Sequence, residues 1–505
     1  MWRDRLSVAG TWVVLREAKL TVRVAMINDG GYPHRQNVGA TWCHRLIRGL
    51  PEDEFDLISI DDHVTPLLAY QPPTNTRGLT SIPTVGRPIG PNRGRAALAH
   101  RRFATHAAVL LCRGMLSDAP HSLAMFRSSL RRLTTASATG VHPLHGVPLA
   151  AVLLDAWRAA GTNAEAILPQ PALPQPTAAD AERIAAVLER ALRVLSTPVE
   201  TADLHHATDA SLGALVAIGA KWRAGTPFVL TEHDTYLTAS ILAGTSGRPA
   251  VRTVLLRFLR SLARLAYLEA TQIAAPTERL RRWALDHGAD PALVTVVGYG
   301  VDPHSCPPLR GEPAEPTITF LGPDRDARTL LRMLPRLRAA HPDIRLIVGA
   351  PPVTAGVVKP GDPVFFLGPV NHRRSAYATG QIVVVSGRHE AAPYALIEAM
   401  MCRRPTVCLD DGALGAVAGT AATTVPYGDV DRLADACLAL LGSADRRRSQ
   451  STACSQRARS LFALRTTIDA VRTVYADATA DPTAEATPDA ADLIRRIRPG
   501  ALSSS

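Results

Sequence analysis

Strand-like and helix-like segments alternate along this chain in two separate series, and this alternation restricts the fold more than any other feature. The first series opens with a strand at 21–28, a glycine-bearing loop, a helix at 40–50 and a strand at 55–60. A strand, a helix and a second strand in succession form a βαβ unit, which predicts a parallel sheet. Further strands are expected at 228–231, 273–275 and 294–297, with helices at 179–195, 251–270 and 277–287.

The alternation starts again after a proline-rich joint at 303–316. The chain has 505 residues, which is more than one hydrophobic core usually serves. We therefore predict an α/β protein with two doubly wound, Rossmann-like domains that face each other across a cleft. In the second series, strands are expected at 317–322, 345–348, 364–367, 382–385 and 406–409, with helices at 327–340 and 430–441.

Segments outside the two series set the expected domain limits. Weak periodicity and many Pro, Gly, Ser and Arg residues predict loops and short helices at 70–105 and 115–145. A Pro-, Ala- and Asp-rich composition at the end of the chain predicts disorder. We expect an N-terminal extension at 1–20, a first domain at 21–305, a second domain at 306–460, a helix at 461–476 that packs back on the first domain, and a disordered tail at 477–505.

A formal net charge of +11 raises the question of an anionic partner. Arginine supplies 53 of the 56 basic residues, and this one-sided usage indicates a compositional bias more than a dedicated basic patch. No aromatic–basic interleaving and no zinc-finger spacing accompany the charge, so nucleic acid is the least favoured partner. Attraction to an anionic donor or to an anionic membrane surface fits the charge equally well.

Cysteine usage and hydropathy bear on the compartment. Seven scattered cysteines without Cys-x-x-Cys spacing argue against a disulfide framework or a zinc site, and they predict a reducing environment. The apolar patch at 6–15 is interrupted by polar residues and lacks a cleavage site, so we expect no signal peptide. No run reaches the ~18 apolar residues of a membrane span. We predict a cytoplasmic protein, and the basic helix at 251–270 leaves open a peripheral position at the inner membrane face.

The segment 386–400, Ser-Gly-Arg-His-Glu-Ala-Ala-Pro-Tyr-Ala-Leu-Ile-Glu-Ala-Met, carries the strongest chemical signal. Pro393 suits the first turn of a helix, which places Glu390 in the preceding loop and Glu398 on the helix. Free backbone N–H groups and the positive end of the helix dipole make such a start an anion site. Glu390 could accept sugar hydroxyls, the amides could hold a diphosphate, and Glu398 could accept ribose hydroxyls. A solvated Glu398 and an ordinary loop glutamate are the alternative.

Together with three other motifs, this glutamate pair resembles the family-4 retaining glycosyltransferases of the GT-B fold. Within them it resembles the branch of the Pel exopolysaccharide glycosyltransferase, the PelF-like branch. The motifs specific to that branch are Leu-Thr-Glu-His-Asp-Thr-Tyr at 230–236 and Gly-Tyr-Pro-His-Arg-Gln-Asn-Val-Gly-Ala-Thr-Trp at 31–42. Gly-Val-Asp at 300–302 is similar to the joint before the family's second domain. The resemblance covers residues 21–475.

The resemblance implies transfer of a hexose from a nucleotide sugar, most simply a UDP sugar, to a saccharide or other acceptor, as in polysaccharide synthesis. The leaving phosphate can itself take the acceptor's proton, so retention needs no enzyme nucleophile. Glu390 and His206 are the implied catalytic residues, with His206 just beyond a strand that ends at Leu204. The implied donor-binding residues are Glu398, Arg325, Pro393, Tyr394 and Ala395, and the acceptor-side residues are Gln36, Asn37, Glu232 and His233.

The implied partners are the nucleotide-sugar donor and the saccharide acceptor, and a contact with a polysaccharide assembly is left open. No metal or other cofactor is expected, because no Asp-x-Asp motif appears where metal-dependent sugar transferases need it. The donor base, the sugar, the acceptor and the oligomeric state are not fixed by the sequence.

Four departures from the family pattern favour an alternative function. They fall on the electrostatic part of the implied site, where one lost cation can cost on the order of 100-fold in rate. The alternative is a catalytically weak or inactive relative that binds a nucleotide sugar or acts as a scaffold. The departures are Gln36-Asn37 for Gly-Gly with Gly39 offset, Pro323 for an arginine with Arg325 or Arg328 as the remaining cation, no arginine at 237–240, and Gly415-Ala416 for Arg-Glu.

Overall fold

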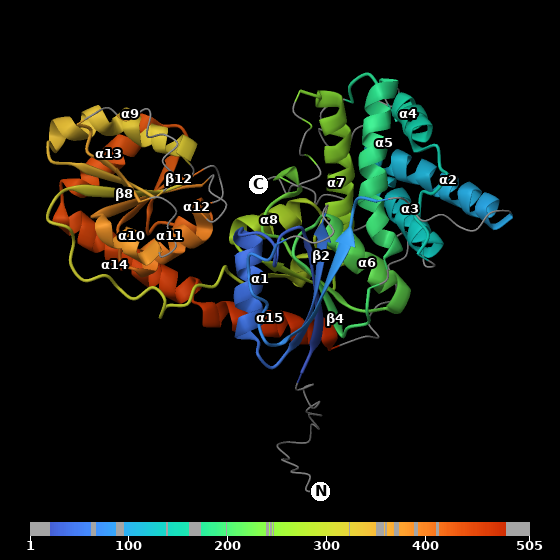
Figure 1. Cartoon of the computed structure of the whole chain (residues 1–505), viewed down its shortest axis with the longest axis horizontal. Helices are drawn as coiled ribbons and strands as arrows, with labels where there is room; N and C mark the ends of the chain where they lie inside the picture. The colour runs from blue at the N-terminus through green and yellow to red at the C-terminus, as the bar shows by residue number, and fades with distance from the viewer. Residues whose placement is uncertain are drawn as a thin grey trace, which may run out of the picture.

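The computed structural model contains two parallel α/β sheets, one in each half of the chain (Figure 1). This confirms the predicted fold class. The structure describes residues 21–480 except for 62–66, 87–94, 138–139, 161–172, 198, 239–241, 243–244, 246, 323, 350–357, 359–360, 368–372, 388–391 and 411–413. The predicted extension at 1–20 and nearly all of the predicted tail lie outside these residues, as does Glu390.

The first sheet has the strand order β3-β2-β1-β4-β5-β6-β7, and all neighbours are parallel. The order reverses between β1 and β4, and ligands of open α/β sheets bind in the crevice beside the carboxyl ends at such a point. The strands are β1 (Arg23–Asp29), β2 (Glu54–Asp61), β3 (Thr76–Pro83), β4 (Leu204–Ala207), β5 (Phe228–Thr231), β6 (Gln272–Ala275) and β7 (Val294–Val296).

Helices cover both faces of this sheet. Alternate strand residues enter two different apolar clusters, one shared with α1 and α15 (Leu464–Thr479), the other with α2 to α8. The helices of the first half are α1 (Val38–Gly49), α2 (Arg95–Leu116), α3 (Ser122–Ala136), α4 (Leu149–Ala160), α5 (Ala178–Leu192), η1 (Arg193–Ser196), α6 (Leu212–Ala224), η2 (Tyr236–Thr238), α7 (Pro249–Glu269), α8 (Glu278–Asp286) and η4 (Pro291–Leu293).

The second sheet repeats the same design with the order β10-β9-β8-β11-β12-β13, again all parallel. Its order reverses between β8 and β11. The strands are β8 (Thr317–Leu321), β9 (Arg345–Val348), β10 (Val364–Phe366), β11 (Ile382–Ser386), β12 (Thr406–Asp410) and β13 (Thr423–Pro426). The helices are α9 (Asp324–Ala340), α10 (Arg373–Thr379), α11 (Ala392–Met401), α12 (Gly415–Ala418), α13 (Val430–Leu441), α14 (Ala444–Leu461) and α15 (Leu464–Thr479).

The chain crosses between its halves twice. The first crossing follows β7, and the second lies between α14, which packs on α11, and α15, which returns to the first sheet (Figure 1). The crossings touch: the Val301 amide donates to the Phe462 carbonyl, and the Leu464 amide donates to the Val301 carbonyl, both at 2.8 Å. α15 buries Val471 and Tyr475 in the apolar cluster that it shares with α1 and α11. One core is therefore continuous through the joint.

Two predictions about the first half are wrong. Residues 95–116 and 122–136 form the helices α2 and α3 instead of loops and short helices. Their apolar faces pack on each other as well as on neighbouring helices, which widens and blurs the apolar stripe that a sequence reading looks for. In addition, the sequence predicted that a strand ends at Leu204, but β4 begins at this residue. Its four residues are all buried, so it shows none of the polar alternation that marks strand limits.

The close crossing of α2 and α3 gives a test of this packing. A Cβ added at Gly114 would lie 2.7 Å from the Phe126 amide nitrogen and 2.9 Å from the Ser122 carbonyl oxygen, which are backbone atoms of α3. Gly114→Ala should therefore lower the free energy of unfolding by about 1–3 kcal/mol, measured by urea denaturation. Gly78→Ala in β3 is the control, because a Cβ there meets no atom within 4 Å. Equal stability of the two variants would contradict the close packing.

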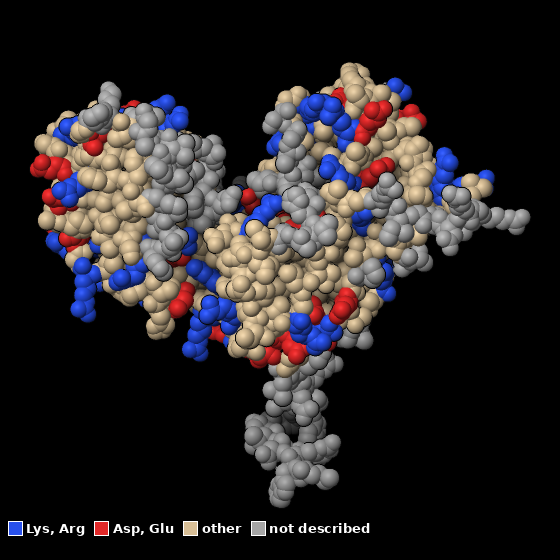
Figure 2. All heavy atoms as spheres, in the orientation of Figure 1, with Lys and Arg blue, Asp and Glu red and all other residues tan. Residues whose placement is uncertain are grey.

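Among the described residues, no helix is long and apolar enough to cross a membrane. On the face drawn in Figure 2, arginine and lysine side chains are spread over both halves and interspersed with carboxylates. The described part of this face thus carries no continuous basic surface. The outline of the molecule is notched between the two halves in the same view.

Candidate functional site

The first part of the site is built on α1, which begins just beyond the carboxyl end of β1. Asn37 caps this helix: its Oδ1 accepts a hydrogen bond from the Ala40 amide at 2.7 Å. Arg45 then projects from the middle of α1 toward the second half of the molecule. Its Nη1 donates to the Gly300 carbonyl at 2.9 Å, and its guanidinium lies over the ring of Tyr394, 4.4 Å from the centroid. α1 thus reaches both the inter-half crossing and α11.

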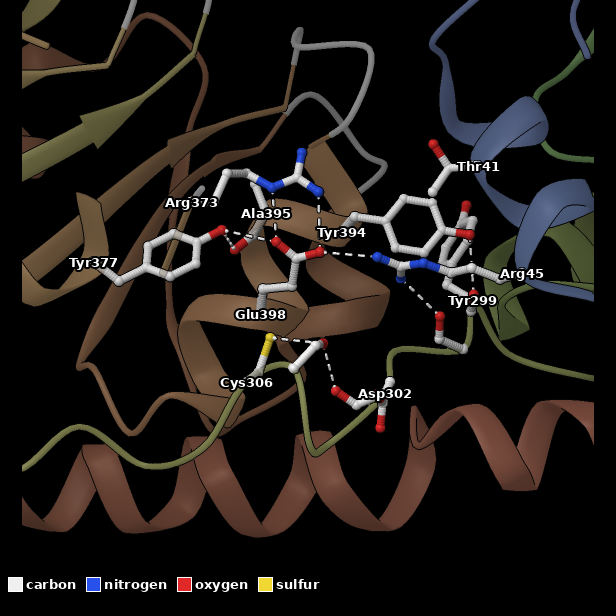
Figure 3. Close-up of polar contacts among 12 residues, drawn as sticks. Thr41, Arg45, Tyr299, Asp302, Cys306, Arg373, Tyr377, Tyr394, Ala395 and Glu398 are labelled. Carbon is white, nitrogen blue, oxygen red and sulfur yellow. Dashed lines mark hydrogen bonds and ion pairs between the residues drawn. The ribbon is translucent and has the colours of Figure 1, made fainter. Parts of the chain in front are cut away.

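Glu398 on α11 receives this arginine and a second one (Figure 3). Arg373, at the start of α10, donates to both carboxylate oxygens, from Nε to Oε2 at 2.7 Å and from Nη2 to Oε1 at 2.9 Å. Arg45 Nη2 donates to Oε1 at 3.1 Å, and the Tyr377 hydroxyl donates to Oε2 at 3.3 Å. A carboxylate offers about four lone-pair sites, so these four bonds saturate it. In this conformation a ribose hydroxyl could reach Glu398 only if an arginine withdrew.

The electrostatics of this cluster agree with its geometry. Glu398 is only 6% exposed, and burial alone would raise the pKa of its carboxyl. The ion pairs and hydrogen bonds with Arg373 and Arg45 more than reverse this, so the pKa lies below its usual range. Burial likewise acts to lower the pKa of Arg373, and the pairing with Glu398 raises it instead. Glu398 is therefore a fully ionised bridge between the two halves.

The start of α11 is covered by the first half of the molecule. Pro393 lies in the first turn, as the sequence predicted, and the side chains of Pro393, Tyr394 and Ala395 are buried. The Tyr394 hydroxyl donates to the Tyr299 carbonyl at 3.0 Å across the joint. The predicted donor-binding residues Tyr394 and Ala395 therefore pack into the protein interior, and only backbone groups of this turn remain as candidate anion contacts.

The second part of the site is a pocket of about 320 Å³ at the carboxyl edge of the first sheet. It opens where the strand order reverses, beside the ends of β1, β4 and β5. Its lining residues come from those three ends and from the start of α1: Asn28, Asp29, Gly31, Tyr32, Asn37, Val38, Gly39, Ala40, Cys43, Thr208, Asp209, Ala210, Ser211, Glu232, His233, Asp234, Thr235 and Tyr236. The structure thus brings three of the four predicted acceptor-side residues, Asn37, Glu232 and His233, to one pocket.

Glu232 is the most perturbed carboxyl in this pocket. It is 3% exposed, and its Oε2 accepts a hydrogen bond from the Tyr267 hydroxyl. Its Oε1 has no hydrogen-bond partner among the described residues. Burial, the largest effect, raises the pKa of Glu232 to about 8, while the bond from Tyr267 acts in the opposite direction. Glu232 is therefore largely protonated at neutral pH.

The adjacent residue His233 has no side-chain hydrogen-bond partner among the described residues. Neither ring nitrogen of His233 bonds to a described residue, and burial lowers the pKa of the imidazole to about 3. Its ring centroid lies 4.9 Å from that of Trp42 on α1. A Cβ at Gly39 would approach the His233 ring to 3.1 Å, which explains the glycine at this position. Gly39 is offset from the position of the family's Gly-Gly pair, but it still allows a close approach, here between the start of α1 and the side chain of His233.

The remaining predicted residues fall elsewhere. Gln36 is exposed and does not line the pocket. His206 is completely buried inside β4: its Nδ1 bonds to the Tyr475 hydroxyl and its Nε2 to the Thr231 hydroxyl, each at 2.7 Å. Because β4 continues past Leu204, His206 faces α15 instead of the strand end, and its geometry is that of a structural residue. Arg325 lies in the first turn of α9, and its side chain is outside the described atoms.

Sequence reasoning missed Arg45, Arg373 and Tyr267. The only available signal was a general one, since a buried carboxylate needs a cation or a proton. Spacing could not say which of 53 arginines would serve Glu398, because Arg45 lies 353 positions away.

Comparisons with known proteins place this geometry in a family. One family model, the domain of unknown function DUF3492, matches residues 22–292, more than half of the chain. The chain belongs to the DUF3492 family. A second model, glycosyl transferases group 1, matches residues 315–443, which span β8 to α13. The second half of this DUF3492 protein is therefore similar to group 1 glycosyltransferases. No curated protein matches the chain in sequence.

Solved structures support the same fold. Sucrose-phosphate synthase from Thermosynechococcus elongatus is similar at a TM-score of 0.54 and 14% identity, over 91% of this chain and 99% of that one. Anabaena HepE, in complex with UDP and glucose, has a TM-score of 0.50 and 12% identity over 90% and 99% of the two chains. A Candida albicans trehalose-6-phosphate phosphatase N-terminal domain has 0.51 and 10% over 94% and 98%. These likenesses show the GT-B fold of the DUF3492 protein.

Proposed function

We propose that this protein is a retaining hexosyltransferase that moves a sugar from a UDP-activated donor to a saccharide acceptor. The observation that carries this proposal is the junction of α1 and α11. Each helix starts beyond the carboxyl end of a parallel strand, β1 or β11, and Arg45 bonds to Glu398 between them. The carboxyl edges of both sheets therefore flank one junction, which suits a donor on one side and an acceptor on the other.

The donor lies against the second half in this proposal. In the sequence Glu390 lies two residues before Ala392, the first residue of α11. There Glu390 would accept hydroxyl hydrogen bonds from the donor sugar, and backbone amides of α11 and Arg325 on α9 would contact the diphosphate. The fold likeness to HepE, which was solved with UDP and glucose, supports UDP as the nucleotide.

Chemistry in this arrangement needs no enzyme nucleophile. The acceptor hydroxyl attacks the sugar carbon from the side of the departing diphosphate, whose oxygen takes the hydroxyl proton. The protein then contributes placement and charge stabilisation. The motifs at 31–42 and 230–236, which form much of the pocket at the first sheet, support a place in the branch of the Pel exopolysaccharide glycosyltransferase and a role in polysaccharide synthesis.

Calorimetry and a turnover assay test the proposal together. UDP should bind the purified protein with a dissociation constant in the micromolar range, whereas ADP and GDP should bind at least tenfold more weakly. UDP-glucose, UDP-galactose and UDP-N-acetylglucosamine are then screened for release of UDP. Binding of UDP without turnover of any donor would favour the weak or inactive relative, which the saturated Glu398 also suits. Absence of any nucleotide binding would refute both.

A further inference from the structure

We propose that the pocket at the carboxyl edge of the first sheet selects the acceptor by charge: it takes an uncharged, hydroxyl-bearing saccharide end and rejects phosphorylated or carboxylated ones. This inference rests on the proposed transferase function and adds the substrate class of its acceptor. It is carried by the charges that line the pocket and by atoms of two buried side chains that have no hydrogen-bond partner among the described residues.

The ionisable side chains that the described lining contributes are mostly acidic. Four carboxyl groups contribute to it, from Asp29, Asp209, Glu232 and Asp234, and none of the described lining residues is lysine or arginine. His233 supplies no positive charge near neutral pH, since burial lowers the pKa of its ring to about 3. An anionic group placed here would lie beside the carboxyl groups of Asp209 and Asp234, and like-charge contacts of this kind weaken binding strongly. The described part of the lining thus disfavours anions.

The same lining is ready to bind hydroxyl groups. Glu232 Oε1 and both ring nitrogens of His233 are buried, and none has a partner among the described residues. Buried polar groups are usually satisfied, so such atoms beside a pocket indicate a ligand that completes them. A protonated carboxyl and a neutral imidazole each offer one donor and one acceptor, which is the pairing that a sugar hydroxyl needs.

Several groups around Glu232 set its protonation. Tyr267 donates to it from α7, Asp209 and Asp234 lie near it at the strand ends, and Arg279 approaches from α8. Burial has the largest effect and raises the pKa of Glu232; the two aspartates act in the same direction, while Arg279 acts against it with the smallest influence. Burial raises the pKa of Asp209 as well. Below about pH 8 Glu232 is neutral and can donate, and above that value it becomes an acceptor-only anion.

Size restricts the ligand further. A volume of about 320 Å³ is at the low end of small-molecule pockets. It suits a single terminal unit of a saccharide with the rest of the acceptor outside. Arg260 and Arg264 on α7 influence the pKa of the hydroxyl of Tyr236, a lining residue, but they do not line the pocket themselves. Among the described residues, they are cations that an anionic acceptor could use.

Calorimetry with matched probes, in the absence of donor, tests this selection. Methyl α-glucoside and maltose are compared with methyl glucuronide and glucose 6-phosphate. The neutral probes should bind at pH 7, and each anionic counterpart should bind at least tenfold more weakly. If only the protonated form of Glu232 binds, a pKa of about 8 predicts about tenfold weaker binding of the neutral probes at pH 9. In Glu232→Gln, whose amide does not titrate, the affinity should change by less than about threefold between pH 7 and pH 9.

Three results would overturn the selection. They are anionic probes that bind as tightly as neutral ones, loss of probe binding in Arg264→Ala, and no binding of either neutral probe. The UDP titration of the same preparation separates this failure from that of the proposed function. Normal UDP binding and donor turnover beside any of the three results would refute the acceptor class alone, whereas a protein that binds no nucleotide would refute the transferase itself.

Discussion

Glu398→Ala should lower the free energy of unfolding by about 1–3 kcal/mol, because it leaves two partly buried arginines, 28% and 23% exposed, without a counter-charge. Arg373 loses both of its hydrogen-bond acceptors, and Arg45 loses its contact across the joint. A partly buried cation that loses its counter-charge is only partly compensated by the water that still reaches it. Urea denaturation followed by circular dichroism measures the change. The variant should also separate the halves more readily, which limited proteolysis at the 303–316 joint would show as faster cleavage.

A matched control exists in the same half of the chain. Glu315 pairs with Arg345, but both side chains are about half exposed, at 47% and 49%. Exposed pairs contribute roughly 0–1 kcal/mol, so Glu315→Ala should change stability little. Equal losses in the two variants would contradict the role of Glu398 as a buried bridge.

The ion pairs of Glu398 also predict that the protein loses stability in acid. Since the folded-state pKa of Glu398 is lowered, its contribution is present at all pH values above the unfolded pKa. The contribution declines as the pH falls below about 4.3, the ordinary pKa of glutamate, toward the lower folded value. In Glu398→Gln this part of the acid destabilisation should be absent.

Glu390→Ala should reduce donor turnover by about 100-fold while leaving the stability unchanged. The reason is that Glu390 would contact the donor sugar and strengthen its hold as positive charge develops on the sugar ring. The measurement is kcat/KM for release of UDP from whichever UDP sugar proves to be the donor. UDP itself lacks the sugar, so its affinity should change by no more than about threefold.

The two glutamates thus have opposite expected profiles, although they lie eight positions apart. Glu398→Ala should act mainly on stability, and Glu390→Ala mainly on turnover. A Glu390→Ala variant that turns over donor at the wild-type rate would remove Glu390 from the site. A Glu390→Ala variant as unstable as Glu398→Ala would instead show that the loop is part of the joint.

The fold could be predicted wherever an element had one simple environment. Strands β5 and β9 and helix α13 have the limits that the sequence indicated, because short apolar runs and a single apolar stripe mark them clearly. α14 was not predicted, because its sequence is mostly polar and shows no apolar stripe. Its buried face consists mainly of small side chains such as Cys454 and Ala458, and Arg447 adds bonds to the Leu440 and Leu441 carbonyls and an ion pair with Glu312. Such contacts depend on tertiary structure and leave no periodic signal.

The same distinction holds for the site: features set by local chemistry could be predicted, and features set by tertiary contacts could not. The start of α11 at Pro393 followed from local helix chemistry, and the gathering of Glu232, His233 and Asn37 followed from the rule that strand ends meet at one edge. The saturation of Glu398 could not be foreseen, since both arginines reach it through tertiary structure. The burial of His206 could not be foreseen either, because its partners Thr231 and Tyr475 lie on a neighbouring strand and on α15.

The return of α15 to the first sheet has a consequence for dissecting this protein. A fragment that stops at the proline-rich joint would keep all seven strands of the first sheet but would leave Trp42, Leu204 and Val229 without the apolar side chains of α15 that share their cluster. It would also leave His206 without its phenol partner. The core of the first half is therefore completed only after α15 has been made, so this core cannot close before the second half has been synthesised.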